Sequence, residues 1–104
     1  MAALTNDRVR AVFGELDAQA VYREVKQTGD FLGFTRRFMH SDDERVARNA
    51  FWTLTKATDQ ELTQLQPILN ELMDLALTTP SSSVRRLSLN IIERLKMEED
   101  ASSS

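Results

Sequence analysis

The chain has 104 residues, with 13 Lys and Arg against 16 Asp and Glu and a formal net charge of −3. This length suits one domain with a modest core, and hydrophobic and charged shares of 41% and 28% are those of an ordinary folded domain. The absence of cysteine excludes disulfides and thiolate sites, and the single histidine, His40, excludes a His-rich metal site. No signal peptide and no membrane-spanning apolar run is evident, so we expect a cytoplasmic protein.

Apolar residues recur at three- and four-residue spacing along almost the whole chain, which predicts an all-α protein. A first helix is expected over residues 6–18 and a short one over 20–26. The expected apolar face of the first helix consists of Val9, Val12, Phe13 and Leu16. A third helix is expected to begin after an N-cap at Asp30.

The next two helices open on capping boxes. Ser41 and Glu44 have the spacing of such a box, as do Thr58 and Glu61. The helix that starts at Thr58 is expected to continue to Leu77, but Pro67 lies inside it. Because proline lacks an N–H, it should bend or split this helix after two turns.

A serine is expected to cap the last helix, which covers about residues 83–98. Residues 99–104 are polar and offer nothing to bury, so a disordered tail is predicted there after a single domain over 1–98.

The chain contains an internal repeat. Val84 lies 38 residues after Val46, and the fourth, eighth and eleventh positions after each valine are small or apolar: Ala50, Leu54, Ala57 and Ser88, Ile92, Leu95. A looser copy of the pattern starts at Val9. Helix pairs at this period indicate a stacked solenoid, although a plain helical bundle with coincidental spacing is the alternative.

The residues that carry this repeat resemble HEAT repeats. Residues 65–73 look like the family's Pro-kinked first helix, and residues 82–89 resemble its turn and the Val-Arg opening of its second helix. Residues 38–50 fit the same pattern, except that Ala47 stands where the family usually has Arg. The resemblance covers about residues 30–96 and implies a short right-handed α-solenoid of antiparallel helix pairs, HEAT- or armadillo-like.

One face of the repeat is basic. At about 100° per residue, the helix that buries Val46 turns a different set of side chains outward, and the last helix repeats these positions 38 residues later. The repeated positions include the uncharged Ser83 and Leu87. The candidate partner-binding residues are Arg45, Arg48, Asn49, Trp52, Lys56, Arg86, Asn90 and Arg94. Tryptophan flanked by arginines is typical of a binding hot spot for an acidic protein. Alternatively, Trp52 packs between helices and the cations are only solvated.

These features favour a noncatalytic protein-interaction or scaffold module that binds an acidic partner segment along its second-helix face. No Gly-rich phosphate loop, nucleophile motif or metal-ligand spacing occurs, so no cofactor is expected. A nucleic-acid-binding HEAT-like solenoid is one alternative, but the net charge of −3 argues against it. A structural subunit of a larger assembly is another. The partner's identity and the oligomeric state are left open.

Overall fold

The computed structural model describes the backbone of residues 5–103 and the side chains of residues 5–97. This part of the chain contains no strand, which confirms the all-α prediction. Its elements in chain order are α1 (Asn6–Arg10), α2 (Glu15–Thr28), α3 (Phe31–Phe38), α4 (Glu44–Leu54), α5 (Asp59–Leu62), the 3₁₀ helix η1 (Thr63–Ile68), α6 (Leu69–Thr78) and α7 (Ser82–Ser103).

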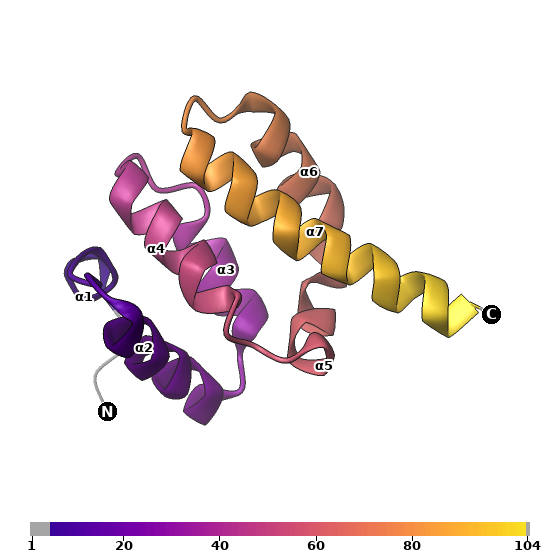
Figure 1. Cartoon of the computed structure of the whole chain (residues 1–104), viewed down its shortest axis with the longest axis horizontal. Helices are drawn as coiled ribbons and strands as arrows, with labels where there is room; N and C mark the ends of the chain where they lie inside the picture. Colours follow the sequence, from indigo (N-terminus) through magenta and orange to yellow (C-terminus); the bar gives the residue numbers. More distant parts are fainter. Residues whose placement is uncertain (1–4, 104) are drawn as a thin grey trace.

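The helices are stacked in two layers. Figure 1 shows α2, α4 and α7 side by side, with α4 in the middle, and α4 packs against both of its neighbours. Behind this layer, α3 packs against α4 and η1, while α6 packs against α7. The pairs α3–α4 and α6–α7 are therefore two successive units of one stack. The right-handed sense of the solenoid stays a prediction.

The predicted 38-residue register coincides with the buried faces of α4 and α7. Val46 and Val84 are 1% and 2% exposed, and Ala50 and Ser88 are equally inaccessible. The later equivalent positions are also buried: Leu54, Ala57, Ile92 and Leu95. Equivalent positions of the two units thus face the core, as expected when successive repeats stack in the same way.

The N-terminal unit differs from its prediction. The helix expected over residues 6–18 breaks into α1 and α2, because Gly14 is extended and serves as the N-cap of α2. The carboxylate of Asp17 accepts a hydrogen bond from the N–H of Phe13 (3.1 Å) across this break. As a result Phe13 and Leu16, which were assigned to an apolar buried face, are 91% and 77% exposed.

The start of α4 also differs from its prediction. The N-cap is Asp43, whose side chain accepts the N–H of Arg45 (2.9 Å), and Ser41 instead accepts the N–H of Asp43 (3.2 Å). The carboxylate of Glu44 does not complete a capping box. It accepts a hydrogen bond from the hydroxyl of Ser81 (2.8 Å), in the loop before α7.

Other local predictions are confirmed. Asp30 caps α3 by accepting the N–H of Gly33 (2.8 Å). The capping box of Thr58 and Glu61 is complete, and the helix that follows is split into α5, η1 and α6, with Pro67 inside η1.

The last helix begins as expected and ends later than expected. The hydroxyl of Ser81 accepts the N–H of Val84 (3.2 Å) in the first turn of α7. The helix continues to Ser103, beyond the predicted end near Glu98. The side chains of the predicted tail, residues 99–104, lie outside the described residues.

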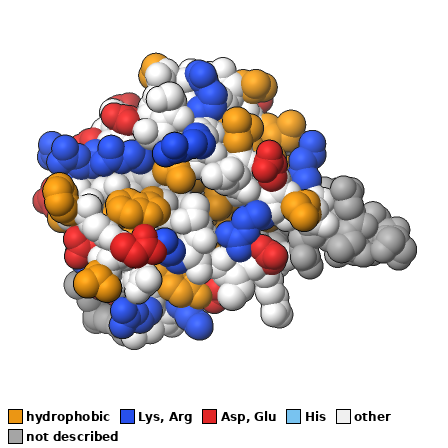
Figure 2. All heavy atoms as spheres, in the orientation of Figure 1, with side chains coloured by type: hydrophobic (Ala, Val, Ile, Leu, Met, Phe, Trp, Pro, Cys, Tyr) orange, Lys and Arg blue, Asp and Glu red, His pale blue; other side chains and the backbone are white. Residues whose placement is uncertain are grey.

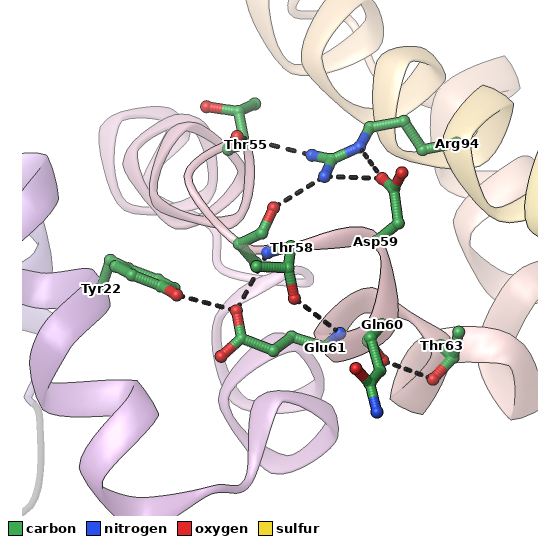
Figure 3. Close-up of polar contacts among 9 residues, drawn as sticks. Tyr22, Thr55, Thr58, Asp59, Gln60, Glu61, Thr63 and Arg94 are labelled. Atoms are coloured by element: carbon green, nitrogen blue, oxygen red, sulfur yellow. Dashed lines mark hydrogen bonds and ion pairs between the residues drawn. The ribbon is translucent and has the colours of Figure 1, made fainter.

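A polar contact joins α2 to α5. The Oε1 atom of Glu61 accepts hydrogen bonds from the hydroxyl of Tyr22 (2.7 Å) and the N–H of Thr58 (2.9 Å), as Figure 3 shows. Partial burial acts to raise the pKa of Glu61, but these hydrogen bonds and nearby Lys26 outweigh it, so the pKa lies below its ordinary 4.5. Burial and the contact with Glu61 raise the pKa of Tyr22.

We expect Tyr22→Phe to lower the free energy of unfolding by about 1 kcal/mol at neutral pH, because the Glu61 carboxylate loses one donor. Since the folded pKa of Glu61 is depressed, its stabilisation is present above the unfolded pKa and is lost as the pH falls through the folded value. Urea unfolding should therefore show the difference between variant and wild type shrinking as the pH drops below 4.5. A difference that stays constant in acid would contradict this contact.

Candidate functional site

A groove of about 300 Å³ lies between α4 and α7. Arg48 and Trp52 line it from α4, and Ser83, Arg86 and Leu87 line it from α7. The two arginines are separated by 38 residues, so they are the same position of two successive units. Because α4 and α7 pack in register, the repeat itself brings both guanidinium groups to one groove.

Trp52 is half-buried. One side of its indole packs against the hydrophobic core, while another part lines the groove. The two sequence-based interpretations of this residue, core packing and exposure on the basic face, therefore each describe part of its surroundings. An aromatic ring fixed by the core and open on one side is a rigid platform for contact.

The cations around the groove are not neutralised within the described part of the chain. Arg45, Arg48 and Arg86 make no ion pair with a carboxylate there, at a limit of 4.0 Å between nitrogen and oxygen. Arg45 and Arg86 are exposed, Arg48 is half-buried, and Asn90 is exposed one turn further along α7. Figure 2 shows Lys and Arg side chains gathered over the N-terminal halves of α4 and α7.

Two other cations of the predicted set have intramolecular partners. Lys56 forms an ion pair with Glu15 of α2. Arg94 binds the carboxylate of Asp59 through Nε (2.8 Å), as Figure 3 shows. Its Nη2 donates to the carbonyl oxygen of Ala57 (2.7 Å). Arg94 thus satisfies backbone carbonyls just after the end of α4, where helices leave acceptors without partners. Both side chains tie the helices together.

Asn49 is not at the surface, so its assignment to the partner-binding face was wrong. It is completely buried, and its Nδ2 donates to the carbonyl oxygens of Val9 (3.0 Å), Arg10 (3.3 Å) and Val12 (3.1 Å) at the end of α1. Its Oδ1 has no hydrogen-bond partner among the described residues. A position at the edge of a helical wheel becomes buried when another element covers it, and α1 does so here.

A family model of the HEAT repeat domain matches residues 5–104. The chain belongs to the HEAT repeat family. This match confirms the resemblance seen in the sequence and extends it to the N-terminal unit. Searches among curated proteins and among solved structures give no match. HEAT repeat proteins generally mediate protein–protein interaction or scaffolding, and the family is generally noncatalytic.

Ser83 and Leu87 belong to the groove of this HEAT repeat chain, although they stood outside the predicted set. They are the equivalents of Arg45 and Asn49, 38 residues later, and were noted among the repeated positions without being included in the candidate set. The repeat register was therefore a sufficient signal to find them. Their hydroxyl and apolar side chains make the groove mixed in character.

The described residues hold no group of three His, Cys, Asp or Glu side chains that could bind a metal ion. None of the helices found in the same part of the chain has the length and apolar character needed to cross a bilayer.

Asn49→Ala and Asn90→Ala form a matched pair that separates a structural from a surface asparagine. We expect Asn49→Ala to lower the free energy of unfolding by about 2–3 kcal/mol, because buried carbonyl oxygens lose their donor. Asn90→Ala should change it by less than about 0.5 kcal/mol, because the side chain is exposed. Urea denaturation measures both, and similar small effects would contradict the role given to Asn49.

Proposed function

We propose that this HEAT repeat chain is a protein-interaction module that holds an acidic segment of a partner protein in the groove between α4 and α7. The observation that carries this proposal is the pair of equivalent arginines, Arg48 and Arg86, that line the same groove as the half-buried Trp52. Neither arginine has a carboxylate partner in the described part of the chain, so a partner's carboxylate adds an ion pair without breaking one.

The side chains of the groove suit a peptide segment that has an acidic residue next to an apolar one. Guanidinium groups bind carboxylates through two parallel hydrogen bonds, and Ser83 offers a hydroxyl beside them. Trp52 and Leu87 offer apolar surface to a neighbouring residue of the same segment. Tryptophan and arginine are the residue types most enriched at binding hot spots. A volume of about 300 Å³ is at the lower end for ligand sites, which suits one or two side chains.

A protein segment is favoured over nucleic acid as the ligand. Phosphate backbones are bound by many cations at once, and two cations of this face, Lys56 and Arg94, are already paired with carboxylates. The whole chain also carries a net charge of −3. The remaining positive surface is small and includes an apolar centre, as a protein contact requires.

Fluorescence gives a direct test, because Trp52 is the only tryptophan. The wild type is titrated with short peptides that place Asp or Glu next to Leu or Phe, and we expect a saturable change in Trp52 emission. Arg48→Glu/Arg86→Glu should weaken binding by at least about tenfold, which corresponds to about 1.4 kcal/mol. The control Arg23→Glu/Arg37→Glu changes the net charge equally at exposed positions outside the groove and should keep the affinity.

Three results would contradict the proposal. Equal loss in the control variant would show that only net charge matters. If no acidic peptide changes the emission of Trp52, the groove is not a binding site for such peptides. Tighter binding of a single-stranded oligonucleotide, with a steep loss of affinity in added salt, would favour the nucleic-acid alternative.

A further inference from the structure

The outer edge of the α6–α7 pair carries exposed apolar side chains. Met73 and Leu77 on α6 are 36% and 78% exposed, and Leu89 on α7 is 43% exposed. Figure 2 shows hydrophobic side chains gathered on the side of the molecule where α6 and α7 lie. Apolar side chains grouped on one surface, rather than scattered singly, mark contact sites.

The repeat register shows what this edge corresponds to. The residues 38 positions earlier are Thr35, Met39 and Phe51, each only 1% exposed. They belong to the α3–α4 pair, on which the next unit packs through η1 and α7. The outer edge of α6–α7 therefore has the positions, and the large apolar side chains, of an interface between units whose other half is not in the described chain.

The charges on this edge are self-complementary. Leu89 lies midway between Arg85 and Glu93, four residues to either side, so the three share one face of α7. Both charged residues are exposed. The guanidinium group of Arg85 is fixed at the edge by the carbonyl oxygens of Ala76 (3.2 Å) and Thr79 (2.8 Å). If two copies of α7 lie antiparallel, Arg85 of each copy faces Glu93 of the other, and the two Leu89 side chains meet between these pairs.

We propose that a second copy of this chain packs on this edge, with a twofold axis close to Leu89 and the two α7 helices antiparallel. Leu89 then meets Leu89 of the partner subunit, and each Arg85 faces a Glu93 across the axis. Met73 and Leu77 extend the apolar contact on both sides. Twofold pairing of one patch with itself is the commonest form of protein oligomer.

The opposite end of the stack does not cover this edge as well. The helix before α2 in the described residues is α1, which packs against α4. A head-to-tail copy would thus present α2 to α7 but would have no helix equivalent to α3 to cover α6, and Met73 and Leu77 would stay exposed. The same edge of a second copy covers both helices.

The dimer leaves the apolar part of the groove open. At about 100° per residue, Leu87 points about 160° away from Leu89 around the axis of α7, whereas Arg86 lies about 60° from Leu89, on the side away from Arg85. The dimer is inferred from residues other than those that carry the proposed binding of an acidic segment, and it would present two grooves.

Sedimentation velocity over a range of concentrations tests the dimer. We expect the wild type to approach twice its 11.9 kDa mass. Leu77→Glu/Leu89→Glu should remain monomeric with an unchanged circular dichroism spectrum, because these side chains are exposed in the single chain. The matched control Phe13→Glu/Leu16→Glu alters exposed apolar residues at the other end of the stack and should still dimerise.

A cysteine variant tests the position of the twofold axis through the gain of a cross-link, so it does not depend on a variant that fails to associate. The chain has no cysteine, and a residue on a twofold axis lies next to its own copy. Leu89→Cys should therefore form a covalent dimer under mild oxidation, while Leu16→Cys should not.

A monomeric wild type at all concentrations would overturn the proposal and leave the edge to a different protein or a further repeat. Open-ended association, or loss of association in the Phe13→Glu/Leu16→Glu variant, would favour head-to-tail stacking and overturn it too. Equal cross-linking of the two cysteine variants would contradict the assigned axis.

Discussion

The packing of α4 against α7 is the constraint on which the candidate site depends. Val46 and Val84 occupy the same position in two successive units, and the small side chains of Ala50 and Ser88 follow them in the buried layer. Small residues let helices approach closely, and close-packed interiors permit few alternative registers. With this register fixed, outward residues of the two helices also come into line, which is how Arg48 and Arg86 reach one groove.

Buried and half-buried polar groups decide which residues of the basic face remain available. A polar side chain near the core usually finds a partner within the protein, since an unmade hydrogen bond is costly there. Asn49 and Arg94 satisfy backbone carbonyls, and Lys56 pairs with a carboxylate. What distinguishes Arg48 and Arg86 is therefore not their charge, which Lys56 and Arg94 share, but the lack of such partners in the described chain.

Features that are determined by a few adjacent residues could be predicted from the sequence. Features that depend on contacts between residues far apart in the chain could not. The cap at Asp30, the box at Thr58 and the split at Pro67 each follow from a few adjacent residues. The burial of Asn49 depends on α1, some 37 to 40 residues away. Helical periodicity continues across Gly14, so the break there was invisible in the apolar pattern. The 38-residue register of the repeat predicted which outward residues of α4 and α7 come into line. It gives no information on which of the cations already form an ion pair with a carboxylate.

Collisional quenching of Trp52 fluorescence by iodide and by caesium tests most directly whether the α4–α7 register places the indole among unpaired cations. Each quenching constant is taken relative to that of a free tryptophan amide. A half-open indole beside Arg48 and Arg86 concentrates anions and repels cations, so the relative constant for iodide should exceed that for caesium by at least about twofold at low salt. Quenching by neither ion, or caesium quenching as strong as that by iodide, would contradict this arrangement.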